Sequence, residues 1–202
     1  MKRAVVNINK VKAGISLKSN ELERVLTKIM EENRDKFKIL SADKGEFDPG
    51  PDIIWEDEKG NLCMAEVMGY GDNRFQYNPR FESAIYKTLK RVFATYDNKR
   101  VRKVALVLPD LITKGGRSLA NRVRVEEFGG RNKGVVCETP SLWKALEELA
   151  KNKGVELVLW IVQLEEPKEI PGKVAIEAIY EHPFSEASEM NENKYKEGTK
   201  VL

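Results

Sequence analysis

Apolar residues recur three and four positions apart in several stretches of the chain, and this spacing predicts helices. The first stretch carries Leu22, Leu26 and Met30 on one stripe, and Ser19 or Asn20 in front of it is a typical helix cap. Helices are therefore expected at Glu21–Lys36, Pro79–Asn98, Ser118–Phe128 and Thr139–Gly154.

Shorter apolar runs, bounded by Gly, Pro, Asn or Asp, predict strands. The turn at residues 58–61 joins two of these runs as a hairpin, and the run Ile170–Tyr180 is expected at an edge of the sheet. The predicted strands are Ala4–Ile8, Phe37–Ala42, Asp52–Glu56, Leu62–Met68, Val101–Leu108, Gly134–Cys137, Val155–Leu164 and Ile170–Tyr180.

The order of these elements indicates the fold class. Helices and strands alternate along most of the chain, which predicts an α/β protein with a mixed β-sheet flanked by helices. No GxGxxG follows a predicted strand and no Walker A loop is present, which argues against a doubly wound dinucleotide fold. We expect one domain over residues 1–184 and a polar, loosely held C-terminal tail over residues 185–202.

The composition narrows the setting in which the protein works. Of its 202 residues 41% are hydrophobic and 33% charged, and no apolar run approaches the roughly 20 residues that a spanning helix needs. The start of the chain lacks the apolar stretch of a signal peptide. We therefore expect a cytoplasmic protein without membrane contact. The net charge of +3 is compatible with nucleic-acid binding but does not require it.

Histidine and cysteine are too scarce for several kinds of site. His182 is the single histidine, and Cys63 and Cys137 are the two cysteines. Both cysteines lie in apolar runs, which is typical of buried thiols. A zinc site of His and Cys ligands and a Ser-His-Asp triad are therefore disfavoured, and no role is assigned to His182. A bound metal would be held by oxygen, which points to Mg²⁺, Mn²⁺ or Ca²⁺.

Two acidic residues mark the predicted hairpin. Asp52 opens its first strand, and Glu66 lies near the end of the second. Antiparallel pairing brings the start of one strand beside the end of the other, so the two carboxylates approach each other. Carboxylates at close range repel unless a cation lies between them. The pair therefore predicts a divalent metal site, with the backbone carbonyl of Val67 available as a third ligand.

Both residues also have simpler interpretations. Asp52 could simply end a loop, and Glu66 could face solvent on an edge strand. Against the latter, Glu66 lies within the apolar run Leu62–Met68, where a carboxylate is costly to bury unless it is paired or metal-bound. Glu21 and Glu23 of the first predicted helix are either solvated acids of its first turn or further groups directed at the site.

The residues Pro51-Asp52 and Glu66-x-Met68, placed on a hairpin between two helices, resemble the PD-(D/E)XK nuclease superfamily. The match covers a core from about Glu21 to Leu108. The resemblance implies a restriction-endonuclease-like αβββαβ core with C-terminal α/β additions. It also implies a restriction-type or repair nuclease that hydrolyses DNA phosphodiester bonds, with Mg²⁺ or Mn²⁺ held by the catalytic residues Asp52 and Glu66. A homodimer is common where both strands are cut.

The chain departs from the family pattern at Met68. The family usually places a lysine there, whose charge orients the attacking water and stabilises the phosphate. A thioether does neither. As in relatives with rearranged sites, Lys90 or Lys87 on the following predicted helix could take this catalytic role. The alternative is a weak or inactive relative that binds nucleic acid through the same fold.

Basic residues gather in two regions beside the proposed site. Either region could contact phosphates or form an ordinary solvated surface, and Glu126 and Glu127 dilute the field of the second region. A third interpretation, an unrelated α/β protein that acts on a small molecule or another protein, has no motif in its favour. The candidate nucleic-acid contacts are Arg80, Arg91, Lys114, Arg117, Arg131 and Lys133.

Overall fold

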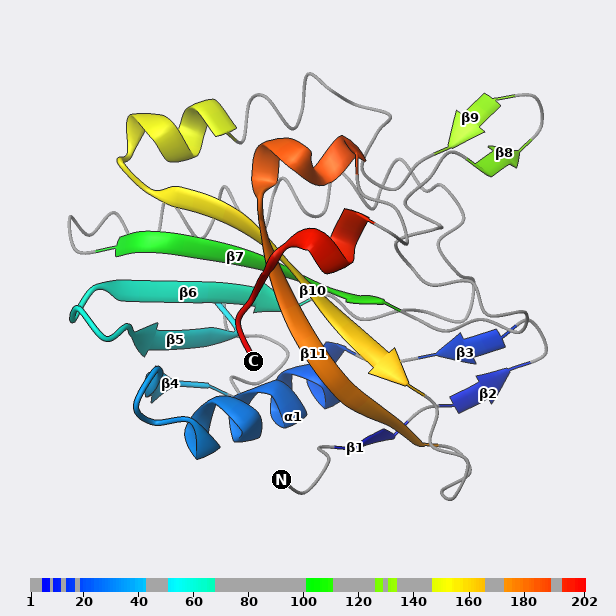
Figure 1. Cartoon of the computed structure of the whole chain (residues 1–202), viewed down its shortest axis with the longest axis horizontal. Coiled ribbons are helices and arrows are strands. Elements are labelled where there is room, and N and C mark those ends of the chain that lie inside the picture. The colour runs from blue at the N-terminus through cyan, green and yellow to red at the C-terminus, as the bar shows by residue number, and fades with distance from the viewer. Residues whose placement is uncertain are drawn as a thin grey trace.

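The fold is built on one mixed β-sheet with helix α1 packed against it (Figure 1). The computed structural model describes residues 5–7, 9–11, 14–16, 19–42, 51–67, 101–110, 126–128, 131–133, 147–165, 173–189 and 194–202. Helix α1 spans Ser19–Glu32, and its predicted stripe of Leu22, Leu26 and Met30 is fully buried. The α/β class expected from the sequence is therefore confirmed.

Eight strands form the main sheet, in the order β1-β11-β10-β7-β6-β5-β4, with β12 paired to β11. The pairs β6–β7 and β7–β10 are parallel, and the other pairs are antiparallel. The bounds are β1 Val5–Asn7, β4 Lys38–Ser41, β5 Ile53–Glu56, β6 Leu62–Val67, β7 Val101–Asp110, β10 Glu156–Glu165, β11 Lys173–Pro183 and β12 Thr199–Lys200. Two separate hairpins are β2 (Asn9–Val11) with β3 (Gly14–Ser16), and β8 (Glu126–Phe128) with β9 (Arg131–Lys133).

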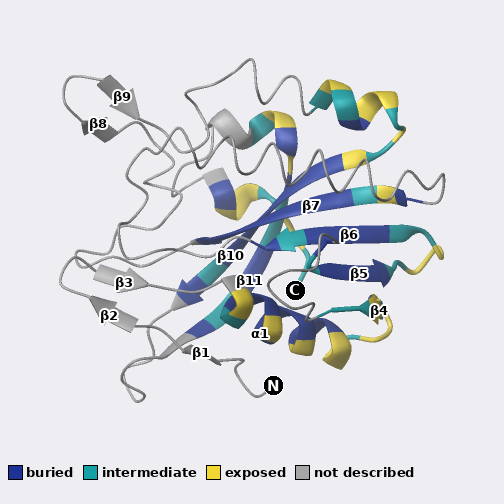
Figure 2. Cartoon of the chain, turned by 180° about the vertical axis from the view of Figure 1, so that it is seen from behind, coloured by how far each residue is buried: buried dark blue, intermediate teal, exposed yellow. Residues whose placement is uncertain are grey.

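The core lies on both faces of the central strands. Successive residues of β7 from Val104 to Leu108 are all buried, as a strand covered on both faces requires. Figure 2 shows the central strands almost wholly buried, while the exposed residues of α1 form its outer side.

Two of the three tryptophans lie at the centre of this core. The ring centroids of Trp55 and Trp160 are 5.3 Å apart, and Phe37 packs edge-on against both. Trp55 is 2% exposed and Trp160 1% exposed. The third tryptophan, Trp143, lies outside the described residues.

Helix α1 ends four residues earlier than its predicted end at Lys36. The side chain of Asn33 donates to the carbonyl of Ile29 at 2.7 Å, and its own carbonyl accepts from Lys36 and Phe37 at 3.0 Å. An asparagine side chain competes for backbone groups in this way, so the helix gives way to a turn that leads directly into β4.

The strand predicted at an edge of the sheet lies inside it. β11 pairs with β10 on one side and with β1 and β12 on the other. The prediction was wrong because Val5 of β1 pairs with Ala175, and pairing between such distant segments leaves no local signal in the sequence.

Residues 126–128 form β8 instead of the end of the helix predicted at Ser118–Phe128. They pair with β9, so that Phe128 lies opposite Arg131. The sequence Gly129-Gly130 between the two strands is a hairpin signal, and it outweighs a weak helical spacing.

The described C-terminal residues pack against β11 and are not the loosely held tail that their polar sequence suggested. Tyr195 is 2% exposed, and its carbonyl oxygen lies 2.7 Å from Nε2 of the buried His182. The N–H of Ile179 donates to the carbonyl of Leu202 at 3.2 Å. His182, which had no assigned role, thus anchors this segment. The elements before β12 are the 3₁₀ helices η1 (Phe184–Glu189) and η2 (Lys194–Glu197).

The helix predicted at Thr139–Gly154 is seen at its C-terminal end. Residues 147–152 are helical, and Gly154 follows with a φ of 66°, as expected of a glycine that ends a helix. The predicted elements Pro79–Asn98 and Gly134–Cys137 lie outside the described residues. In the described part of the chain, no helix is long and apolar enough to cross a membrane.

Candidate metal centre

The hairpin of β5 and β6 positions the two candidate carboxylates. In its turn, Oδ1 of Asp57 accepts hydrogen bonds from the N–H groups of Lys59 and Asn61 at 2.9 and 2.8 Å. Gly60 has a φ of 76°, which residues with a Cβ rarely adopt. Desolvation raises the pKa of Asp57, but the hydrogen bonds from Asn61 and Lys59 outweigh it and the net pKa is lowered. This turn fixes the register of the hairpin.

The register places the two carboxylates opposite each other. Ile53 pairs with Ala65, and one further step brings Asp52 opposite Glu66. Directly opposed residues of an antiparallel pair project from the same face, with Cβ atoms about 4.5–5.5 Å apart. The register thus brings together the two acids that the sequence singled out.

A hydrogen bond that the sequence did not suggest joins the two strands at the open end of this hairpin. Oδ2 of Asp52 accepts from the backbone N–H of Val67 at 2.6 Å. The sequence pointed to the carbonyl of Val67 and not to its N–H. The signal in the sequence was the position of Asp52, one residue before β5 and opposite the end of the paired strand β6.

Glu66 has one side in the protein interior. Its Oε2 atom is shielded from solvent, and the neighbours Ala65 and Val67 are 0% and 4% exposed. Strand β6 lies between β5 and β7, so the edge-strand interpretation of Glu66 does not hold. A carboxylate in such a position is costly unless it binds a partner.

The donors of this pair fit a small divalent ion. Within the described ranges, no three His, Cys, Asp or Glu side chains gather closely enough to hold a metal. A site here would therefore use two carboxylates, completed by the Val67 carbonyl, water or substrate oxygens. Mg²⁺ is commonly held in this way, whereas Ca²⁺ takes about six to eight oxygens.

The two acids of α1 differ in their surroundings. Glu21 forms an ion pair with Arg24, with 3.1 Å between Oε1 and Nη2, at the helix surface. Glu23 is 6% exposed and therefore lies in the interior. It does not complete a three-residue group with Asp52 and Glu66. Of the two acids, only Glu23 is buried.

The cations proposed from the sequence stay predictions. Arg131 and Lys133 lie on β9, where Lys133 is opposite Glu126. The others fall outside the described residues: Lys87, Lys90, Arg80, Arg91, Lys114 and Arg117.

A second polar cluster lies near the turn of the β5–β6 hairpin and lines a cavity of about 200 Å³. Nζ of Lys103 lies 2.8 and 2.9 Å from the two carboxylate oxygens of Glu181, and Nε1 of Trp160 donates to Glu181 at 2.7 Å. Burial lowers the pKa of Lys103, but the hydrogen bonds and charge of Glu181, with help from Glu156, outweigh it and the net pKa is raised.

Cys63 lines the same cavity but is unsuited to nucleophilic chemistry. Burial, assisted by the charge of Asp57, raises the pKa of its thiol to about 12. The thiolate is the reactive form, so this thiol is inert near neutral pH. The predicted buried thiol is confirmed for Cys63, which is 2% exposed.

No protein-family model matches this chain, and no curated protein matches it in sequence. A solved structure that it resembles is SfsA of Pyrococcus furiosus in complex with Ca²⁺, with 14% sequence identity and a TM-score of 0.40. The match covers 82% of this chain and 66% of SfsA, so this chain spans less than two thirds of that protein. A likeness at this level carries no argument about the site.

Proposed function

We propose that this protein is a metal-dependent nuclease that hydrolyses phosphodiester bonds in DNA. The observation that supports the proposal is the register of the β5–β6 hairpin, in which Ile53 pairs with Ala65 and Asp52 and Glu66 are the next residue of each strand towards its open end. The sequence around the pair supports it, because Pro51-Asp52 and Glu66-x-Met68 are the residues that resemble the PD-(D/E)XK nucleases.

Asp52, Glu66 and the carbonyl of Val67 would hold Mg²⁺ or Mn²⁺. An ion of this kind supplies Lewis-acid polarisation of a phosphate and lowers the pKa of bound water. The hydrogen bond from Val67 to Asp52 orients one carboxylate in advance, so less order has to be imposed when substrate arrives. Lys90 or Lys87 would orient the attacking water and offset the charge that develops on the phosphate.

Met68 supports a second candidate, a nucleic-acid-binding protein of the same fold with weak or no catalysis. Its thioether replaces the lysine of the family pattern and carries no charge. On the other side, opposed carboxylates repel each other unless a cation lies between them, which favours metal chemistry. We therefore place the nuclease first.

The test is cleavage of supercoiled plasmid, linear duplex and single-stranded DNA by the purified chain in Mg²⁺, in Mn²⁺ and in EDTA. We expect cleavage with either ion and none in EDTA. Glu66→Gln is the matched control, because it preserves shape and removes charge. Equal cleavage by this variant would point to a contaminating nuclease and contradict the proposal. DNA binding without cleavage would favour the second candidate.

A further inference from the structure

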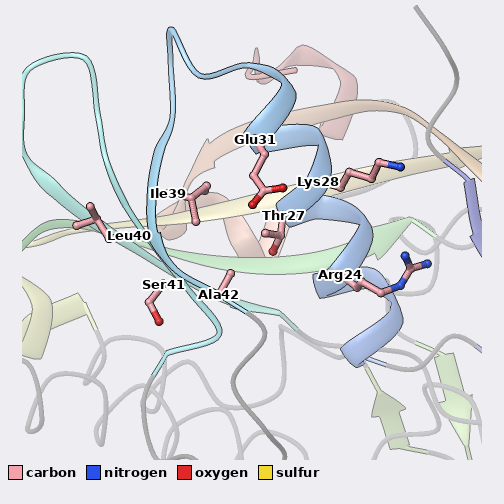
Figure 3. Close-up of a pocket in the computed structure, with 8 residues that line it drawn as sticks. All are labelled: Arg24, Thr27, Lys28, Glu31, Ile39, Leu40, Ser41 and Ala42. Atoms are coloured by element: carbon pink, nitrogen blue, oxygen red, sulfur yellow. The ribbon is translucent and has the colours of Figure 1, made fainter.

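A groove of about 700 Å³ separates α1 from β4 (Figure 3). Its volume lies within the roughly 300–1,000 Å³ of typical ligand sites. Its lining residues are Arg24, Thr27, Lys28 and Glu31 from α1, and Ile39, Leu40, Ser41 and Ala42 from β4 and the residue after it.

The groove leads towards the candidate metal centre. The turn at residues 33–36 joins α1 to β4, so Glu31 lies beside Ile39, while Arg24 lies on α1 towards the opposite end of the groove (Figure 3). Ser41 pairs with Ile54, which is two residues beyond Asp52. That end of the groove is therefore displaced from Asp52 by roughly 5 Å sideways and roughly 7 Å along the strand.

Two cations line the groove, and one of them, Arg24, forms an ion pair with Glu21. Arg24 and Lys28 are one helical turn apart, and the single carboxylate of the lining, Glu31, lies at the end away from Asp52. Lys28 is exposed, and it makes no ion pair with any residue that the structure describes. A cation in this position is available to an anionic ligand.

Thr27 indicates that the groove accepts a polar ligand. It is 9% exposed, and its Oγ1 is buried without a hydrogen-bond partner in the described part of the chain. A helical threonine commonly satisfies its hydroxyl on a carbonyl three or four residues back, and Thr27 does not. A buried hydroxyl left unsatisfied costs about 1–3 kcal/mol, which a ligand oxygen reached by a small rotation of the side chain would offset.

The edge of β4 argues against a peptide strand as the ligand. Its ladder with β5 is interrupted between Ile39 and Ser41, so Leu40 bulges out and is 48% exposed. The exposed Lys38 lies on the same short strand. Bulges and edge lysines are the features by which sheets resist the addition of another strand.

We propose that this groove binds the sugar–phosphate backbone of a nucleic-acid strand that continues into the candidate metal centre. The proposal rests on the nuclease function proposed above. Lys28 contacts a phosphate, the hydroxyls of Thr27 and Ser41 donate to phosphate or sugar oxygens, and Leu40 packs against a sugar, while Arg24 stays paired with Glu21. Cationic and hydroxyl side chains are the usual backbone contacts of nucleic-acid-binding proteins.

The test is binding of fluorescent single-stranded and duplex oligonucleotides by the full chain, measured by anisotropy in EDTA over a series of salt concentrations. Lys28→Gln removes one phosphate contact. We therefore expect weaker binding and a plot of log affinity against log salt that is shallower by about 0.7 for the single strand or 0.9 for the duplex. Lys151→Gln makes the same charge change on an exposed lysine outside the groove and should leave the slope unchanged.

Thr27→Val separates binding from folding. It keeps the shape of the side chain and removes the buried hydroxyl, so the thermal midpoint should stay level or rise while binding weakens. If the wild type binds and cleaves DNA but Lys28→Gln and Thr27→Val both match Lys151→Gln, the groove proposal is overturned and the nuclease stands. If the wild type binds through the groove without cleaving, the nuclease proposal is contradicted and the groove proposal stands. If it neither binds nor cleaves, both are overturned.

Discussion

Oδ2 of Asp52 accepts a hydrogen bond from the backbone N–H of Val67 at 2.6 Å, across the open end of the β5–β6 hairpin. This bond gives Asp52 a structural role that can be separated from its proposed role as a metal ligand. An asparagine at position 52 keeps an acceptor for Val67 but carries no charge, whereas an alanine keeps neither.

We predict that Asp52→Asn folds with nearly wild-type stability and loses cleavage by about a hundredfold or more. Asp52→Ala should lose cleavage equally and, in addition, about 1–3 kcal/mol of unfolding free energy, because the N–H of Val67 is left without its acceptor. Urea unfolding and a plasmid assay measure the two effects. Wild-type cleavage by Asp52→Asn would remove this residue from the site.

A bound ion should stabilise the protein whether or not it is active. We predict that Mg²⁺ or Mn²⁺ raises the thermal midpoint, since a ligand at a hundred times its Kd adds about 2.7 kcal/mol to the stability of the folded state. Glu66→Gln should abolish the rise without lowering the midpoint in EDTA. An equal rise in this variant would place the ion elsewhere.

The lysine that the family pattern places at position 68 is a methionine in this chain, and this difference gives a further prediction. If Lys90 or Lys87 has taken its place, replacing that residue by alanine should lower cleavage by about 10²–10³ and leave unfolding unchanged. Met68→Lys should preserve or raise activity where the site can seat the longer chain. Cleavage by Met68→Lys but not by wild type would identify a nuclease that lost its activity when the lysine was replaced.

The hairpin and its two acids were predictable because the signals are local. Gly60 marks the turn, apolar residues bound the strands, and the pairing of Asp52 with Glu66 follows from counting outward from that turn. The interior position of β11 and the anchoring of the C-terminal segment were not predictable. Both depend on contacts between separate segments, such as that of His182 with Tyr195. Neither residue type indicates from the sequence which partner it contacts.

The pairing of Lys103 with Glu181 predicts how stability changes with pH. The folded pKa of Lys103 is raised, so its contribution is fully present below the unfolded value of about 10.4 and is lost as the pH rises through the folded value. Lys103→Met should therefore destabilise the protein at pH 7, by about 1–3 kcal/mol. The difference in unfolding free energy between Lys103→Met and wild type should become smaller above pH about 10.4.

Lys38→Met is the control for this experiment. Lys38 also pairs with a carboxylate, Glu56 at 2.8 Å, but its side chain is 70% exposed. Exposed ion pairs contribute about 0–1 kcal/mol, so its loss should have little effect at any pH. Urea unfolding of both variants and of wild type at pH 7, 9 and 11.5 measures the two effects. A pH-independent loss in Lys103→Met would assign the effect to packing.

The pairing of β1 with β11 has a consequence for the order in which the protein folds. Val5 meets Ala175, so β1 is synthesised long before the strand that receives it. A contact that joins such distant segments must close a very long loop first, and proteins rich in such contacts fold slowly. The hairpin of β5 and β6 can form early from neighbouring residues. The far side of the sheet has to wait for β11, and β1 stays without its strand partner until then.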